Sequence, residues 1–196
     1  PNILILCGGK GLRLRPITND IPKPLVKINN TPILEYIINQ FKKYKFDKFI
    51  IATGYKSNKI SKFMRDSFKK LNYKIINSGD TDILTRIRDS IEYSDNDFIL
   101  CYGDTISNIN LDKLVDYSSQ YPKCATVTTF PIMIPFGVME IGKNNFVKSF
   151  IEKPTLNSVM NIGYFYFSKK HHDLFFKYNN FIEVLSSLIK KNSLIS

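Results

Sequence analysis

The sequence has few of the side chains that bind transition metals or form disulfides, because its 196 residues include only three cysteines and two histidines. Cys7, Cys101 and Cys124 lie far apart without paired spacing, which argues against a disulfide framework and a thiolate metal site. Cys7 and Cys101 fall within apolar runs, so we interpret them as small core residues. His171 and His172 are adjacent and therefore point in different directions, which makes them a poor metal pair.

The sequence also lacks an apolar stretch long enough to cross a membrane, and no charged-then-apolar leader precedes a cleavage site. Its apolar content of 43% and charged content of 23% are ordinary for a globular protein. A chain of 196 residues is long enough for one domain with a substantial core. We therefore expect a single cytoplasmic domain over residues 1–196, without a membrane partner.

Negative charge is scarce, since 17 acidic residues against 28 lysines and arginines give a formal net charge of +11. A basic protein can bind nucleic acid. Here, however, the lysines are spread along the chain, and no aromatic RNA-binding signature, zinc-finger spacing or helix-turn-helix pattern accompanies them. We expect no nucleic-acid partner and interpret the charge as attraction for small anionic substrates, with RNA binding as the alternative.

The N-terminal segment is the most informative part of the chain. Residues 3–7 are apolar and β-branched, which is typical of a strand buried on both faces of a parallel sheet. Gly8, Gly9 and Gly11 then allow a tight turn whose backbone N–H groups can converge on an anion. Fixed positive charge follows on Arg13, Arg15 and Lys23. This combination predicts a site for a polyphosphate.

Two common phosphate-binding motifs do not fit this segment. Residues 8–23 contain no Walker A string, which requires Gly-Lys followed by Ser or Thr. The dinucleotide fingerprint also fails, because Leu14 stands where its last glycine belongs. Taken alone, the glycines would indicate only a strand-to-helix turn.

The first two-thirds of the chain alternate strand and helix. Thr31 is predicted to cap a helix with Pro32 at its first position, followed by an apolar stripe that ends at Phe41. Apolar runs and periodic stripes then predict strands over 46–53, 73–76, 98–102 and 125–130, and helices around 60–68, 83–91 and 111–117. This order is typical of a single-domain, Rossmann-like, doubly wound α/β fold with a mostly parallel mixed sheet and ligands at the carboxyl ends of its strands.

The last third of the chain does not alternate strand and helix. We predict strands over 137–141, 146–151 and 160–167, with a turn around Gly142 and another around Pro154. Two helices follow, near 172–178 and 181–190.

A carboxylate follows the predicted strand 98–102, in the string Tyr102-Gly103-Asp104. Alone, Asp104 could simply cap a turn. We expect it to lie beside the end of the first strand and so beside the polyphosphate loop. It would there be a natural ligand for Mg²⁺, which proteins usually hold with one or two carboxylates plus substrate phosphates.

The N-terminal string resembles the signature of the nucleoside-triphosphate transferases that make nucleotide-activated sugars, Gly-Gly-x-Gly-Thr-Arg-Leu-x-Pro-Leu-Thr followed by Pro-Lys-Pro-Leu. Leu12 replaces the usual Thr, which removes one hydroxyl contact to phosphate, and Ile17 replaces the usual Leu. The resemblance implies the nucleotide-diphospho-sugar transferase fold, an enzyme, and a division at about residue 130 into a nucleotide-binding part (1–130) and an acceptor-binding part (131–196).

The resemblance also implies site residues. Arg13 would neutralise the leaving pyrophosphate, Lys23 would lie near the α-phosphate, and Asp104 would bind Mg²⁺ as cofactor. The implied nucleotide-binding residues are Leu6, Gly8, Gly9, Gly11, Arg13, Lys23, Gly79, Asp80 and Asp104. The implied acceptor-binding residues are Tyr102, Glu152, Lys153 and Asn161, the last three from the strings Glu-Lys-Pro and Asn-x-Gly.

The string Ser78-Gly79-Asp80, a following arginine and the later Tyr-Gly-Asp look most like the cytidylyltransferase branch of this family, which implies CTP as the nucleotide. Either Arg86 or Arg88 can be that arginine. The middle insertion of the glucose-1-phosphate cytidylyltransferases is missing, and no counterpart of the family's second metal-binding Asp precedes Ser196.

The short chain is similar to cytidylyltransferases whose acceptors are not sugars, and we expect phosphoglutamine, used for capsule or cell-surface polysaccharide precursors. A sugar 1-phosphate is the runner-up. A non-catalytic nucleotide sensor is the alternative of another class, although the presence of Arg13, Lys23 and Asp104 together argues against it. A homo-oligomer is compatible with the family.

Overall fold

The structure, a computed structural model, describes residues 1–94 and 96–196. This part of the chain divides into two compact units. The first comprises residues 1–127 and 163–196, and the second comprises residues 128–162.

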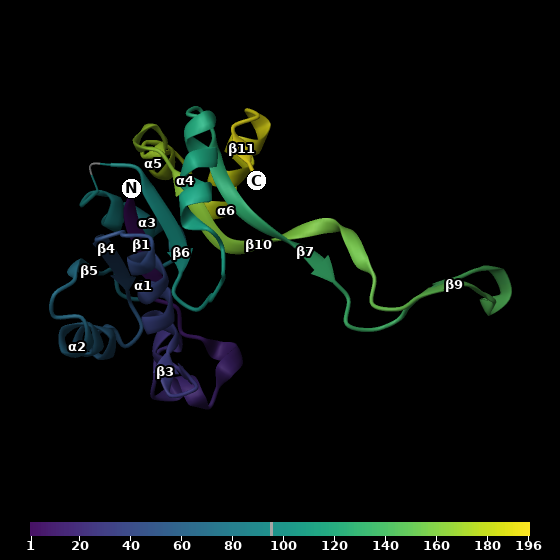
Figure 1. The fold of residues 1–196 in the computed structure, drawn as a ribbon, viewed down its shortest axis with the longest axis horizontal. Coiled ribbons are helices and arrows are strands. Elements are labelled where there is room, and N and C mark those ends of the chain that lie inside the picture. The colour runs from purple at the N-terminus through teal and green to yellow at the C-terminus, as the bar shows by residue number, and fades with distance from the viewer. Residues whose placement is uncertain (95) are drawn as a thin grey trace. The chain divides into compact units, whose positions relative to one another are not determined.

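A seven-stranded sheet forms the centre of the first unit, in the strand order β11-β7-β10-β6-β1-β4-β5 (Figure 1). The pairs β1–β4, β1–β6, β4–β5 and β7–β11 are parallel, and β10 runs antiparallel to β6. The predicted α/β fold with a mostly parallel mixed sheet is therefore confirmed. The strands are β1 (Asn2–Cys7), β4 (Lys48–Thr53), β5 (Asn72–Asn77), β6 (Phe98–Tyr102), β7 (Ala125–Met133), β10 (Thr155–Phe167) and β11 (Leu194–Ile195).

Helices cover both faces of this sheet, because its central strands are apolar on both sides. Alternate residues of β1 point to opposite faces, with Ile3 and Ile5 in one core and Leu4 in the other. The helices α1 (Ile33–Lys43), α2 (Ser57–Ser67) and α4 (Leu111–Gln120) contribute to the first core. The helices α3 (Ile83–Ile91), α5 (Leu174–Lys177) and α6 (Phe181–Lys190) contribute to the second. This is the doubly wound arrangement.

The expected helix cap at Thr31 is wrong. Thr31 and Pro32 form β3 and pair with β2 (Lys27–Ile28) in a short hairpin. The two turn residues, Asn29 and Asn30, have φ values of 47° and 65°, which asparagine adopts more readily than most residues. Pro32 keeps an extended backbone and precedes α1, so the hairpin rather than a side-chain cap sets the start of the helix.

The first of the two predicted C-terminal helices is shorter than expected. Near 172–178 the structure has the single-turn helix α5, which follows a 3₁₀ turn over Lys169–His171. Helix α6 has the predicted bounds and is capped by Asn180, whose side chain accepts a hydrogen bond from the Glu183 N–H at 2.9 Å. Other 3₁₀ turns of this unit are Leu12–Leu14, Ile17–Asn19 and Lys23–Leu25.

The second unit contains an antiparallel hairpin of β8 (Val138–Ile141) and β9 (Val147–Ile151). A 3₁₀ turn, Lys143–Asn145, connects the two strands. The register shifts by a bulge between Glu140 and Ile141. The outer parts of β7 and β10 complete this unit, where the Ile134 N–H donates to the Pro154 carbonyl at 3.0 Å.

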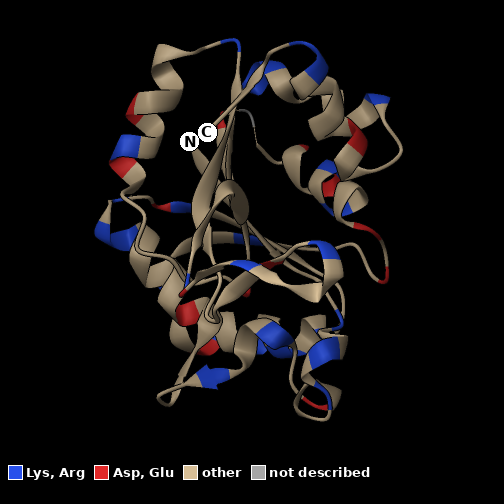
Figure 2. Cartoon of the chain, turned by 90° about the vertical axis from the view of Figure 1, so that its right-hand side faces the viewer, with Lys and Arg blue, Asp and Glu red and all other residues tan. Residues whose placement is uncertain are grey.

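Positive charge is widely distributed over the structure. Figure 2 shows Lys and Arg on helices on both sides of the sheet and in several loops. No helix in the described residues is long and apolar enough to span a membrane.

Candidate active site

A cavity of about 560 Å³ opens in the first unit at the carboxyl ends of β1 and β6. These two parallel strands are neighbours, and the Gly103 N–H donates to the Leu6 carbonyl at 2.9 Å. This pairing brings the glycine-rich loop and Asp104 to one edge of the sheet, as predicted. The lining residues are Leu6, Cys7, Gly8, Gly9, Gly11, Leu12, Arg13, Leu14, Lys23, Pro24, Ile83, Arg86, Tyr102 and Asp104.

The glycine-rich loop is held by hydrogen bonds that involve Thr18 and Tyr55, which are not among the lining residues of the cavity. Gly11 has a φ of 63°, in the left-handed region that glycine adopts without strain. The buried Thr18 hydroxyl donates to the Gly11 carbonyl at 2.9 Å, and the Tyr55 hydroxyl donates to the Thr18 carbonyl at 2.9 Å. The loop therefore has a fixed course before any ligand binds.

Lys23 and Asp104, both lining residues of the cavity, form an ion pair. The Lys23 Nζ lies 2.5 Å from Asp104 Oδ2, and the two side chains are 35% and 31% exposed. Lys23 comes from the 3₁₀ turn after Pro22, whereas Asp104 follows β6. The sequence predicts both residues for this site, and the structure adds that they contact each other.

Arg13 lines the same cavity with an exposed side chain. Among the residues that the structure describes, it forms no ion pair with an acidic side chain. Its guanidinium group is therefore available to an anionic ligand.

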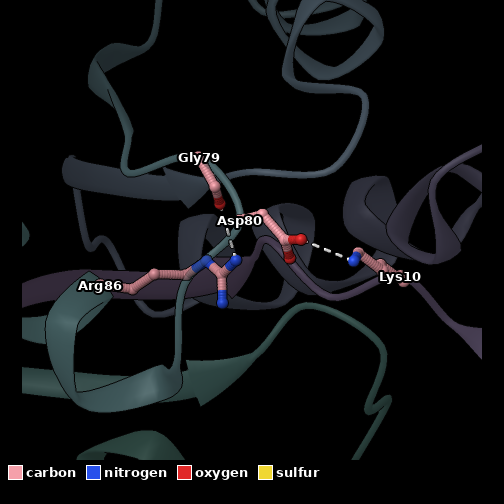
Figure 3. Close-up of polar contacts among 4 residues, drawn as sticks. All are labelled: Lys10, Gly79, Asp80 and Arg86. Atoms are coloured by element: carbon pink, nitrogen blue, oxygen red, sulfur yellow. Dashed lines mark hydrogen bonds and ion pairs between the residues drawn. The ribbon is translucent and has the colours of Figure 1, made fainter.

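Arg86 also lines the cavity, although it is only 6% exposed, and Figure 3 shows its guanidinium group beside the Gly79 carbonyl. Its Nη2 donates to the Gly79 carbonyl at 2.9 Å, and its Nε has no hydrogen-bond partner in the described structure. Burial lowers the pKa of this guanidinium, while the charges of Asp80 and Asp82 act in the opposite direction. A guanidinium group has only donors, so this residue of the cavity lining suits a ligand that offers hydrogen-bond acceptors.

The Arg86 side chain fits in its position because neighbouring residues are glycines, which have no side chain. A Cβ at Gly8 would overlap the Arg86 guanidinium, and a Cβ at Gly54 would overlap the Gly79 carbonyl and approach Arg86 Nη2 to 2.7 Å. The arginine thus lies across the ends of β1, β4 and β5, and only residues without a side chain fit there.

Arg88, the other arginine of α3, has a structural role. Its Nε donates to the Phe175 carbonyl at 2.5 Å, and its Nη2 donates to the Tyr178 carbonyl. It therefore ties α3 to the segment around α5. Of the two arginines left open by the sequence, Arg86 lines the cavity.

The loop that carries Gly79 and Asp80 lies beside the cavity lining. Gly79 has a φ of 69°, and its N–H donates to Asn77 Oδ1 at 3.1 Å. Asp80 pairs with Lys10 of the glycine-rich loop at 2.6 Å (Figure 3). The structure therefore places both predicted nucleotide-binding residues near the site, Gly79 through Arg86 and Asp80 through Lys10.

Two further cavity residues have informative surroundings. The Tyr102 ring lies where a Cβ on Gly163 would be, so this glycine, with a φ of 80°, makes room for the ring. Burial raises the pKa of the Cys7 thiol above its ordinary value, and the charge of Asp104 acts in the same direction. Cys7 therefore stays protonated and is unsuited to act as a nucleophile.

The remaining predicted acceptor-binding residues belong to the second unit. Glu152 and Lys153 lie between β9 and β10, where Lys153 has a φ of 45°, and Asn161 lies in β10. Their predicted role in acceptor binding stays a prediction.

The cavity has the donor set for a metal held largely by its substrate. Asp104 is its one acidic lining residue, and the described residues contain no group of three or more His, Cys, Asp or Glu side chains that could enclose a metal. This fits Mg²⁺ in its usual form, bound by one carboxylate together with ligand phosphates and waters.

Sequence reasoning missed several lining residues, namely Cys7, Leu14, Pro24 and Ile83. Most are apolar neighbours of predicted site residues along the chain. A cavity wall of this kind has no motif of its own, because any side chain that flanks a loop can contribute to it.

Fold and site together define an α/β protein with a glycine-rich loop and several cationic side chains around a cavity at the carboxyl ends of parallel strands. A family model described as nucleotidyl transferase matches residues 2–191. The chain belongs to this family and is a nucleotidyltransferase.

Individual relatives agree with this assignment. The chain is 34% identical to a Bacillus subtilis protein named probable glucose-1-phosphate cytidylyltransferase, covering 97% of this chain and 85% of that protein. It is 33% identical to the D-glycero-alpha-D-manno-heptose 1-phosphate guanylyltransferase of Campylobacter jejuni, covering 76% of this chain and 67% of that protein. Among solved structures, a UDP-glucose pyrophosphorylase complexed with UDP-glucose shares the fold with a TM-score of 0.72 and 17% identity, covering 97% of this chain and 87% of that one.

Proposed function

We propose that this enzyme transfers a cytidylyl group from CTP to a small phosphorylated acceptor and releases pyrophosphate. An acceptor phosphate oxygen attacks the α-phosphorus in line, and the bond to the pyrophosphate oxygen breaks. No protein nucleophile is needed, so the protein contributes positioning and charge stabilisation. The observation that carries the proposal is the convergence of the glycine-rich loop, Arg13, Lys23 and Asp104 on one cavity.

Each charged group has a distinct role in this proposal. Arg13 neutralises the leaving pyrophosphate, and Lys23 stabilises the charge at the α-phosphate and the attacking oxygen. Mg²⁺, held by Asp104 and the phosphates, would supply further neutralisation of the phosphate oxygens. The Leu12 side chain, 58% exposed at the cavity, offers no hydroxyl to a phosphate.

Arg86 supports cytosine as the base. Its guanidinium provides only hydrogen-bond donors, and Arg86 lines the cavity. The O2 and N3 atoms of cytosine are adjacent acceptors, whereas N3 of uracil carries a proton and would be a donor facing a donor. The relative with 34% identity is named as a cytidylyltransferase, which agrees with this choice.

Two acceptors are candidates. Relatives named for glucose 1-phosphate and heptose 1-phosphate favour a sugar 1-phosphate. The alignment to the Bacillus subtilis relative spans 217 positions, more than the 196 residues of this chain, so that relative has residues that this chain lacks. The missing insertion favours phosphoglutamine, a smaller acceptor that is not a sugar, for which we expect Glu152, Lys153 and Asn161 to provide contacts.

Pyrophosphate release tests the proposal. The enzyme is incubated with Mg²⁺ and each of CTP, UTP, dTTP, ATP and GTP, paired with glucose 1-phosphate, a heptose 1-phosphate, phosphoglutamine or phosphocholine. We expect release with CTP and one acceptor. Faster release with another nucleotide would contradict the choice of CTP, and CTP binding without release for any acceptor would favour a nucleotide sensor.

A further inference from the structure

The Lys23–Asp104 contact has a consequence for ligand binding. The Nζ of Lys23 lies 2.5 Å from Oδ2 of Asp104, and about two-thirds of each side chain is shielded from solvent. Partial burial makes such a pair stronger than one on the open surface. The carboxylate therefore neutralises Lys23 at the place where a phosphate would need its charge.

The same contact also restricts Asp104. One of its carboxylate oxygens is held by an ammonium group, so a metal ion that approaches this oxygen meets a positive charge. Asp104 is the one acidic side chain among the described residues that line the cavity. A metal and a phosphate thus each need one partner of the pair.

Arg13 differs from Lys23 in its ion pairing. It lines the same cavity, and none of the ion pairs in the described part of the chain involves it. Phosphate can reach Arg13 without breaking an existing ion pair, whereas it can reach Lys23 only after the Asp104 carboxylate has moved or has been neutralised.

We propose that the Lys23–Asp104 ion pair locks the phosphate site, and that a metal-bound triphosphate opens it by taking both partners at once, Asp104 to the metal and Lys23 to a phosphate. This inference rests on the proposed function. Metal and nucleotide then bind cooperatively. The metal draws Asp104 away from Lys23, which leaves Lys23 for the phosphate, and the phosphate draws Lys23 away from Asp104, which leaves Asp104 for the metal. A triphosphate without metal binds weakly, since it must separate the pair and then lies next to an uncompensated carboxylate.

Calorimetric titration of CTP with and without Mg²⁺ tests the lock. In EDTA, Asp104→Asn should bind CTP about threefold to tenfold more tightly than the unaltered protein, because Lys23 is released and a negative charge is lost. With Mg²⁺, the unaltered protein should gain affinity strongly, whereas Asp104→Asn should change by less than about twofold. Asparagine keeps the size of the side chain, so folding is preserved.

Two controls separate the lock from a general charge effect. Asp116→Asn, on the exposed side of α4, removes one negative charge elsewhere and should leave CTP affinity in EDTA unchanged. In a Lys23→Met background, Asp104→Asn should tighten CTP in EDTA by less than about twofold, because no lysine is released.

The outcomes distinguish this inference from the proposed function. If CTP binds the unaltered protein but Asp104→Asn does not bind it more tightly in EDTA, the lock is wrong and the proposed function stands. If Asp104→Asn tightens binding equally with and without Lys23, simple repulsion explains the effect and the lock is also wrong. If neither CTP nor UTP nor GTP binds the unaltered protein with Mg²⁺, the proposed function and the lock fall together.

Discussion

The cavity lining holds positive charge in two different ways. Lys23 is about one-third exposed and has a carboxylate partner, and the exposed Arg13 lines the same cavity. Arg86 is 6% exposed and is held between glycines, with a backbone carbonyl as its hydrogen-bond acceptor. Partly exposed cations can change partners as a ligand binds, which suits phosphates that react. An enclosed cation has one fixed position, which suits recognition of a base.

The largest expected effect is a loss of turnover when one of the partly exposed cations, Lys23 or Arg13, is removed. Lys23→Ala or Arg13→Ala should fold normally and lose at least about a hundredfold in turnover, because one contact to transition-state charge contributes on the order of 3–4 kcal/mol. Pyrophosphate release under saturating substrates measures this loss. Lys27→Ala, an exposed lysine of β2, is the matched control and should retain activity within about twofold. Near-normal turnover in either active-site variant would remove the basis for the proposed mechanism.

One added methyl group, in Gly8→Ala, is expected to displace the enclosed side chain of Arg86. Gly8→Ala should lower the free energy of unfolding by about 1–3 kcal/mol, because its Cβ would overlap the Arg86 guanidinium and force it to move. Gly9→Ala is the control, since no atom lies within 4 Å of its added Cβ. Urea unfolding of the two variants gives the comparison, and equal stability of both would show that Arg86 does not occupy this position.

Arg86 itself tests base recognition. Arg86→Lys keeps the charge but removes the planar set of donors, so the preference for CTP over UTP in kcat/KM should fall about tenfold. Arg88→Lys, two residues further along α3, should leave this preference unchanged, because Arg88 contacts carbonyls near α5. A preference that survives Arg86→Lys would assign base selection to another group.

A smaller effect is expected from pH, away from the cavity. Burial lowers the pKa of His171 and His172 below 6.5, so unfolding takes up protons as the pH falls through that value and stability decreases. For Asp97, hydrogen bonds from Tyr166 and the Lys169 N–H outweigh burial and lower the pKa below 3.8, so its contribution is lost below that pH. Thermal unfolding between pH 8 and 4 measures the decrease in stability that the two histidines cause. His172→Asn should reduce the dependence of the unfolding temperature on pH near pH 6. An unchanged dependence would contradict the burial of His172 as a neutral ring.

The sequence was sufficient for those features that follow from strand order. Parallel strands end at the same edge of a sheet, so the loop after β1 and the carboxylate after β6 were expected together, and they are. The choice between Arg86 and Arg88 needed the structure. Two residues along a helix differ by about 200° in direction, and which direction meets the cavity depends on how α3 packs against the sheet. The Thr31 cap failed for a related reason, because the pairing of β3 with β2 took priority over a local helix signal.

The crystal structure of the enzyme with Mg²⁺ and a CTP analogue that cannot be cleaved at the α-phosphate tests the account most directly. We expect the triphosphate at the glycine-rich loop with Arg13 and Lys23, Asp104 on the metal instead of on Lys23, and the cytosine ring against Arg86 and Gly79. A nucleotide bound outside this cavity, or one whose base lies at Lys23 and whose phosphates lie at Arg86, would contradict the account.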